Sequence, residues 1–426
     1  MLRDVLPARP EARRMLVGTI FSSLGHGLTL PFLFIYLSEV RHIPSGIVGL
    51  LIGWFGLLTL VVTPFGGTLI DRLGARRVVL PALLLEAAGL GAIALVGTVW
   101  QAWAALTLAG LGGAVIWAGQ NTIMTSLTGE SERQKIFGFQ FALLNLGIGV
   151  GAAISGSIVD VNRVETFQFI YVLDMLCYLG PFLILFSMPT VGLRLVERDP
   201  AAGTREKGYA EVWAHRPFRR FMMFSVLLTV SGYAQFEVGF TGFATKTIGV
   251  SPAVIGYSFT ANTLVIVLAQ LLVIKRLQGR SRSRALAGVG AIFGLAWLIL
   301  GATGYVEGTS AALSAAGVIA FGAIFAVGET LLAPTNPALA NALATDELRG
   351  RYNALASMAW GISGIIAPVS AGPLLQLGLG WLWIILVAAG CLGASLLALS
   401  LRGLITAEQD GRAAETTPTR VGPVAV

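Results

Sequence analysis

The chain has little charge and few of the residues from which enzymes and metalloproteins build their sites. Only 12% of its 426 residues are charged, against about 25% in an average soluble protein. Its two cysteines, Cys177 and Cys391, lie in apolar runs, which excludes a disulfide framework or a cysteine metal site. The histidines His26, His42 and His215 have no ligand spacing, and no phosphate-binding Gly-x4-Gly-Lys-Ser/Thr loop occurs. We therefore expect no enzyme activity, no cofactor and no ATP-driven step.

What the chain has in abundance is apolar sequence. It is 55% hydrophobic, with a mean hydropathy of +0.78, and a membrane span takes roughly 20 apolar residues. Runs of that length fall at 15–38, 47–70, 78–99, 102–124, 136–158, 167–188, 218–243, 252–274, 285–306, 311–341, 351–375 and 379–401. These runs predict an all-α polytopic membrane protein with twelve transmembrane helices.

Basic residues gather on one side of these spans. The net charge is +7, and of the 29 Lys and Arg only Arg41, Arg163 and Lys246 fall in loops on the side opposite the termini. Basic loops stay in the cytoplasm, so the pattern predicts that both termini are cytoplasmic. The charge therefore marks topology in a lipid bilayer, and we expect no nucleic-acid partner.

A long polar segment at 190–217 divides the spans six and six. It predicts an N-terminal half at 1–189, a cytoplasmic linker at 190–217, a C-terminal half at 218–403 and a disordered cytoplasmic tail at 404–426. The basic N-terminal segment leads into a full-length span without a small-residue cleavage site, which is typical of a retained first helix.

The two halves repeat weakly. Residues 113–120 align with 322–329, 133–156 with 349–372, and 70–76 with 274–280. Internal repeats in a polytopic chain favour a substrate site between the halves, near the middle of the bilayer.

Four acidic residues lie inside predicted spans: Glu86, Asp174, Glu237 and Glu329. No Lys or Arg lies deep in any span to neutralise them, and an ionised acid in the bilayer costs at least a few kcal/mol. Each acid must face a wet cavity, accept hydrogen bonds or bind a proton. A carboxyl that is neutral when dry and charged when wet is a proton carrier.

Aromatic residues accompany two of these acids at helical spacing. The shared faces are Tyr233, Phe236, Glu237 and Phe240 on the seventh span, Gly322, Phe325 and Glu329 on the tenth, and Gly113, Trp117, Gln120 and Met124 on the fourth. An acid among aromatics suits a lipophilic cation, which gains ion pairing, cation–π attraction and apolar burial. Ordinary helix packing or lipid contact is the alternative explanation of such a stripe.

The sequence GGTLIDRLGARR at 66–77 is a short charged hairpin between the second and third spans. Its Gly67, Leu69, Asp71, Arg72, Gly74, Arg76 and Arg77 resemble the loop 2–3 signature of the major facilitator superfamily of transporters, with Ala75 as a departure. Glycines at 67 and 74 permit close approach at a tight turn. Acids on the seventh and tenth spans resemble the bacterial multidrug/proton antiporters of that superfamily. The resemblance implies two six-helix halves around a cavity lined by helices 1, 4, 7 and 10.

The resemblance also implies residue roles. A conformational latch would comprise Gly67, Asp71, Arg72, Gly74 and Arg76, and proton coupling would use Glu329 and Glu237. Substrate binding would involve Glu237, Glu329, Tyr233, Phe236, Phe240, Trp117, Gln120, Phe325 and His26. A structural hydrogen bond is the alternative role for Glu237, Glu329 and His26, and structural roles are favoured for Glu86 and Asp174.

Two patterns of the family are incomplete. The helix 5 antiporter motif maps to Gly147, Gly151 and Gly156, but Ala152 replaces its proline and Ser155 one glycine. These small residues still permit close helix packing. Leu106 stands where many members carry a buried arginine, which places proton coupling on Glu237 and Glu329.

The resemblance and the acids together predict a monomeric transporter in a bacterial plasma membrane. It would export lipophilic, cationic small molecules by alternating access, driven by the proton gradient, as in multidrug efflux and antibiotic resistance. The alternative is a specific metabolite, sugar or peptide transporter, for which Gln120, Asn121, Gln235, Asn262 and Asn336 supply dispersed polar groups. A membrane scaffold or sensor is disfavoured because the regions outside the membrane are small.

Overall fold

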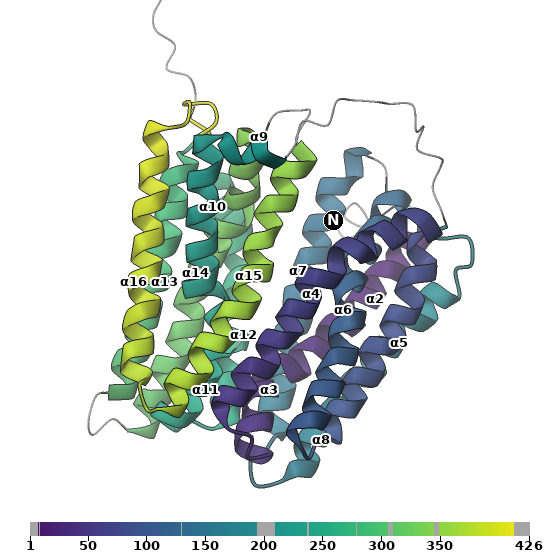
Figure 1. The fold of residues 1–426 in the computed structure, drawn as a ribbon, viewed down its shortest axis with the longest axis vertical. Helices are drawn as coiled ribbons and strands as arrows, with labels where there is room; N and C mark the ends of the chain where they lie inside the picture. Colours follow the sequence, from purple (N-terminus) through teal and green to yellow (C-terminus); the bar gives the residue numbers. More distant parts are fainter. Residues whose placement is uncertain are drawn as a thin grey trace, which may run out of the picture.

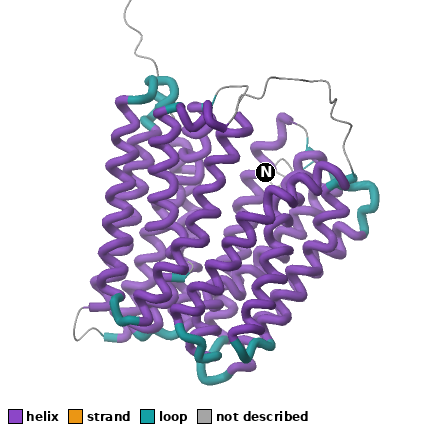
Figure 2. The backbone as a smooth tube through the Cα atoms, in the orientation of Figure 1, coloured by secondary structure: helices purple, strands orange, loops and turns teal. Residues whose placement is uncertain are grey.

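The computed structural model describes residues 7, 9–128, 130–193, 209–236, 238–277, 279–305, 310–344 and 349–412. Helices dominate this part of the chain, with short loops at the two ends of the molecule (Figure 2). The only strand-like feature in the described ranges is an isolated bridge between Asp160 and Arg163. The predicted all-α polytopic architecture is confirmed.

The first bundle contains the helices up to residue 186 (Figure 1). Its elements are α2 (Pro10–Thr29), η1 (Leu30–Phe32), α3 (Leu33–Ile35), η2 (Tyr36–Val40), α4 (Ser45–Leu73), α5 (Ala75–Ala94), α6 (Val99–Leu127), α7 (Glu130–Ile158) and α8 (Val164–Phe186). Its first span is continuous from Pro10 to Val40, passing through η1 and η2. Thr98 and Gln101 form a reciprocal capping box that starts α6.

The second bundle follows the short helix α9 (Tyr209–Ala214). Its elements are α10 (Arg216–Leu228), η3 (Thr229–Tyr233), η4 (Ala234–Phe236), α11 (Gly239–Phe243), η5 (Ala244–Ile248), α12 (Pro252–Leu277), α13 (Arg282–Tyr305), α14 (Ala311–Leu343), α15 (Arg349–Gln376), α16 (Gly380–Ser400) and η6 (Leu401–Gly403). The described residues contain 11 helices able to span a membrane, or 12 when Arg216–Phe236 and Gly239–Ile248 count as one broken span.

The two bundles meet along two seams, α4 against α15 and α7 against α12. Glycines make these approaches possible. A Cβ atom on Gly256 of α12 would lie 2.5 Å from the carbonyl oxygen of Ala152, and one on Gly49 of α4 would lie 2.4 Å from that of Pro368. Such contact between backbones is the packing that small residues allow between membrane helices.

Contacts between the bundles gather at the end of the molecule opposite the N-terminus, where α3 and α11 lie (Figure 1). There the Lys246 ammonium lies 3.0 Å from a carboxylate oxygen of Glu39, and the Gly46 amide donates to Gln376 Oε1 at 2.7 Å. At the opposite end, that of the N-terminus, the helices diverge (Figure 1). The two bundles therefore meet at one end of the molecule and diverge at the end of the N-terminus (Figure 1).

Parts of the predicted linker and tail carry defined structure. Helix α9 lies inside the predicted linker, whereas residues 194–208 and 413–426 lie outside the described residues. Residues 404–412, placed in the predicted tail, form turns that dock on the start of α13. The buried Asp410 accepts hydrogen bonds there from the Ser283 amide at 2.8 Å and the Ser281 hydroxyl at 2.7 Å. Burial opposes ionisation, but these donors and Arg412 outweigh it, so the pKa of Asp410 lies below its usual value.

Candidate functional site

A cavity of about 560 Å³ lies between the two bundles. Trp117 of α6 and Phe141 of α7 line it from the first bundle, and every other lining residue comes from the second. Those residues are Tyr233, Ile266, Gln270, Glu329, Leu332, Ala333, Asn336, Pro337, Ala340, Asn353, Ala356, Ser357 and Trp360. Its size is that of a pocket for a small organic molecule.

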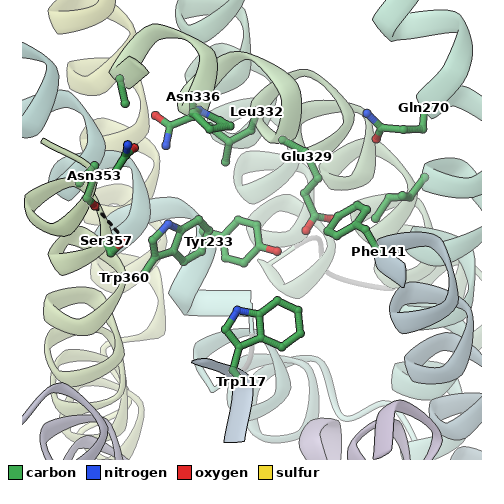
Figure 3. A pocket seen from close by; sticks show the side chains of 15 residues that line it. Trp117, Phe141, Tyr233, Gln270, Glu329, Leu332, Asn336, Asn353, Ser357 and Trp360 are labelled. Carbon is green, nitrogen blue, oxygen red and sulfur yellow. Dashed lines mark hydrogen bonds between the residues drawn. The ribbon is translucent and has the colours of Figure 1, made fainter. Parts of the chain in front are cut away.

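Glu329 points into this cavity from α14 (Figure 3). Two side chains hold its carboxyl group: Asn262 of α12 donates its amide to Oε2, and Tyr233 forms a second hydrogen bond. Asn262 Nδ2 also donates to the carbonyl oxygen of Gly322, about two helical turns before Glu329 on α14, at 3.4 Å. The carboxyl is therefore fixed in place yet keeps one face toward the cavity.

A proline in α14 frees a backbone carbonyl that a residue of the cavity wall then binds. Pro334 has no N–H, so it leaves the carbonyl of Thr330 without its helical partner. Gln270 of α12 lies 3.4 Å from that carbonyl oxygen and donates to it. Asn336 also lines the cavity, and its side-chain oxygen accepts a hydrogen bond from Ser225 at 3.4 Å. Two amide side chains, Gln270 and Asn336, therefore line the cavity together with Glu329.

Aromatic rings form much of the remaining wall. The Tyr233 and Trp360 rings meet edge to face with centroids 4.6 Å apart, and Trp117 lies across the cavity from them (Figure 3). Trp117 is 52% exposed and Phe141 is 41% exposed, so both present ring surface to an occupant. Such rings attract cations, especially where water is scarce.

Glu329 is the one charged side chain among the described residues that line this cavity. A bound cation would meet one carboxyl, several amides and four aromatic rings. A bound anion would meet a carboxylate and no basic group among those residues. The cavity therefore combines one acidic group with a largely aromatic and apolar wall.

The structure brings together three of the predicted site residues: Glu329, Tyr233 and Trp117. Phe236, Phe240 and Phe325 do not line the cavity, contrary to expectation, because they stack in a buried aromatic cluster. Phe325 lies 4.9 Å from Phe236, ring centroid to ring centroid, and 4.0 Å from Phe293. In this structure they are packing residues. Glu237 lies outside the described residues.

His26 and Gln120 line a second cavity, of about 260 Å³, inside the first bundle. Glu86 and Tyr178 also line it, and Trp117 lies between it and the larger cavity, lining both. His26 and Gln120 are therefore near the central cavity but not part of its lining.

An apolar groove of about 680 Å³ runs between α4 and α15. Ser357 and Trp360 line both this groove and the central cavity, and Leu60, Pro64 and Met358 complete much of its wall. The groove and the central cavity therefore adjoin each other at these two residues.

The predicted latch forms the turn from α4 to α5. Gly74 has a φ of 87°, which favours glycine. Arg76 donates to the carbonyl oxygens of Phe186 at 2.9 Å and Met188 at 3.2 Å, at the C-terminal end of α8, where a cation is stabilised. Arg72 is exposed.

The two remaining latch residues lie inside α4. The side chain of Asp71 lies outside the described residues. The close approach expected at Gly67 occurs instead at Gly66, whose Cβ would lie 2.0 Å from Val115, whereas nothing lies within 4 Å of a Cβ on Gly67.

The three glycines of the incomplete helix 5 motif pack closely. A Cβ on Gly147 would clash with Ser23, and one on Gly151 with the Leu24 carbonyl oxygen, both on α2. Gly156 faces Gly256 of the second bundle, with a Cβ-to-Cα distance of 3.2 Å. Close packing therefore persists without the family's proline.

Several lining residues were not predicted. Asn353, Ser357 and Trp360 on α15 follow an i, i+4, i+7 spacing, so a helical face that is polar and aromatic within an apolar span was present in the sequence. Phe141 and Gln270 gave no comparable signal. In the described part of the chain no three His, Cys, Asp or Glu side chains gather into a metal-binding group.

Comparisons with known proteins agree with this architecture. The chain is 22% identical over 399 residues to a Na(+), Li(+), K(+)/H(+) antiporter of Planococcus maritimus, covering 87% of this chain and 91% of that one. It is 23% identical over 265 residues to multidrug resistance protein 1 of Bacillus subtilis, covering 62% of this chain and 65% of that protein. A crystal structure of a peptide transporter in complex with sulfate superimposes with a TM-score of 0.75 at 15% identity, over 94% of this chain and 97% of that one.

The sequence profile of the Major Facilitator Superfamily matches residues 15–243 and 222–424, which together span nearly the whole chain. The helical architecture and the loop between α4 and α5 agree with this match. The chain belongs to the major facilitator superfamily of membrane transporters.

Proposed function

We propose that this transporter exports lipophilic cations across a bacterial plasma membrane in exchange for protons, with Glu329 as the shared binding group. The observation that carries the proposal is the placement of Glu329 as the single charged side chain among the described lining residues of an aromatic-walled cavity. Relatives named as multidrug resistance and cation/proton antiporters support the same class of activity.

In the proposed cycle, the ionised Glu329 attracts a cation, which packs against Trp117, Tyr233 and Trp360. Asn262 and Tyr233 hold the carboxylate toward the occupant. Protonation after opening to the other side removes the charge, and the cation leaves. A ligand shifts a conformational equilibrium only through its differential affinity for the two states, and cation and proton supply opposite biases through one carboxyl.

The groove between α4 and α15 supports access from the bilayer. A lipophilic cation partitions into the membrane, and this apolar groove shares Ser357 and Trp360 with the central cavity. With the termini cytoplasmic, as the basic loops predict, the groove and cavity face the inner leaflet and the cytoplasm.

Exchange of alkali cations is a second candidate, favoured by the printed activity of one relative. An alkali ion prefers a shell of oxygen ligands, whereas this cavity offers about 560 Å³ walled largely by aromatic and apolar side chains. The size and the aromatic wall favour an organic cation. A substrate carrying a carboxylate fits less well, because no Lys or Arg is among the described lining residues.

The test is uptake of a fluorescent lipophilic cation into inverted membrane vesicles under an imposed pH gradient. Wild type is compared with Glu329→Gln, which keeps size and polarity, and with Glu165→Gln, an exposed control at the start of α8. Uptake that an uncoupler and Glu329→Gln abolish, but Glu165→Gln preserves, supports the proposal. Full uptake in Glu329→Gln, or proton flux driven by sodium or potassium but not by the organic cation, overturns it.

A further inference from the structure

Two buried acids in the first bundle have no part in the proposed cycle. Glu86 lies on α5 and is 6% exposed, and Asp174 lies on α8 and is fully buried. They are close enough for their charges to interact, and Tyr178, one turn after Asp174, forms a hydrogen bond with Glu86. Tyr178 therefore lies next to Glu86 and one helical turn from Asp174 along α8.

Both acids retain free oxygen atoms. Thr29 of α2 donates to Asp174 Oδ2 at 2.6 Å, but Asp174 Oδ1 and Glu86 Oε2 have no hydrogen-bond partner in the described part of the chain. Asp174 Oδ1 lies against Gly25 of α2, and Glu86 Oε2 against Gly113 of α6. Buried carboxylate oxygens of this kind are costly unless something neutralises them.

Glu86 lines the cavity of about 260 Å³ within this bundle. Asp174 is not among the residues that line that cavity. The remaining titratable groups that face the pair are His26 on α2 and Tyr171 and Cys177 on α8; α4, α6 and α7 present only uncharged lining residues. No Lys or Arg is among the described residues that line this cavity.

Two ionised carboxylates in this setting would repel one another and lack counter-ions. One proton on the pair removes a charge and supplies a donor for a free oxygen. We propose that Glu86 and Asp174 form a second proton-binding site, which holds one exchangeable proton and exchanges it with the 260 Å³ cavity through Glu86.

The site is connected to the central cavity through Trp117. That residue lies one turn after Gly113 on α6, against which Glu86 packs, and it lines both cavities. A cation bound against Trp117 therefore contacts α6, the helix against which Glu86 packs. This link to transport rests on the proposed function, whereas proton binding by the pair does not.

Infrared difference spectroscopy tests proton binding without any transport step. The protein in liposomes is titrated from mildly acidic to alkaline pH while the carbonyl stretch of protonated carboxyl groups is followed. We expect a reversible band that Glu86→Gln and Asp174→Asn each remove, and that Glu329→Gln and the exposed control Glu165→Gln leave in place. A band that never titrates, or that survives both isosteric variants, overturns the proposal.

Two further arms keep the result decisive. Tyr178→Phe removes the hydroxyl that hydrogen-bonds Glu86 with little change in packing, so it should move the midpoint of the same band even where the acid variants fold poorly. An unmoved midpoint overturns the assignment of the band to Glu86 and its partner. Replacing choline by sodium at constant pH should leave the band unchanged. Loss of the band on adding sodium would show an alkali-ion site and overturn the assignment to a proton.

Discussion

Replacing Glu329 by Gln should weaken binding of a lipophilic cation much more than binding of a neutral molecule of similar shape. At about 4 Å, with an effective dielectric constant of about 20, a cation and a carboxylate attract by about 4 kcal/mol. Desolvation of both charges offsets part of this attraction, so about 1.5–3 kcal/mol remains. That corresponds to a roughly 10- to 150-fold increase in Kd.

The assay is equilibrium binding of tetraphenylphosphonium and of the neutral triphenylphosphine oxide to purified protein. Calorimetry gives both Kd values, and quenching of Trp117 and Trp360, which line the cavity, reports where the ligand binds. Trp117→Phe serves as the control for the fluorescence signal. The phosphonium Kd should increase by the factor above in Glu329→Gln, while the phosphine oxide Kd changes less than about threefold.

Acid pH provides an internal check. Protonation removes the charge of Glu329, so wild type should lose phosphonium affinity as the pH falls, whereas Glu329→Gln should show no such dependence. An equal loss of affinity for both ligands would mean that Glu329 acts through shape. An unchanged phosphonium Kd would refute the reasoning entirely.

Three further changes test the fold around the site. Gly256→Ala should destabilise the contact between α7 and α12 by about 1–3 kcal/mol through overpacking, because its Cβ would lie 2.5 Å from a backbone oxygen of α7. Distances between spin labels placed on either side of this seam measure the shift. Gly288→Ala, where nothing lies within 4 Å of the added Cβ, should leave those distances unchanged. Lys246→Gln should shift the same distances by only about 0.2–1 kcal/mol, because its ion pair with Glu39 is partly exposed, and a charge-swapped pair should restore them. Asp410→Asn should weaken docking of residues 404–412 by about 1–2 kcal/mol, seen as faster hydrogen exchange at the Ser283 amide. Because the pKa of Asp410 is lowered in the folded protein, its stabilisation of docking is complete above the ordinary pKa of about 3.9. That stabilisation is lost as the pH falls through the lowered, folded-state pKa. Equal protection of the Ser283 amide from hydrogen exchange in wild type and Asp410→Asn would contradict this.

The spans were predictable because a bilayer imposes one requirement on every residue within it: backbone polar groups must bond within a helix and side chains must be apolar. The same requirement made Glu329 conspicuous. A carboxyl in an apolar run needs a cavity or a partner, and the structure supplies both in the central cavity and Asn262.

The aromatic face of the seventh span was not predictable by the same rule. Tyr233, Phe236 and Phe240 share a face only if the helix keeps 3.6 residues per turn. Here π-helical turns run through Thr229–Tyr233 and a 3-10 turn through Ala234–Phe236. Each change of helix type rotates the following side chains, so Tyr233 reaches the cavity while Phe236 and Phe240 enter the core. Periodicity cannot locate such a change in a sequence that is apolar on all sides.

In the proposed cycle one carboxyl serves both sides of the membrane, and the order of residues along each helix is compatible with this. On α15 the lining residues at 353–360 precede the seam contacts that begin near Gly364, and on α12 the seam glycine Gly256 precedes the lining Ile266 and Gln270. Asn262 lies between these two regions and bonds Glu329, while its neighbour Thr263 donates to the Asn145 carbonyl oxygen of α7 at 3.2 Å. Glu329 is thus placed where the cavity ends and the seam begins. If α7 and α12 separated along that seam, the cavity would extend past the Glu329 carboxyl toward the opposite end of the molecule. Glu329 would then meet the substrate from one side of the membrane and the proton from the other without changing its place on α14.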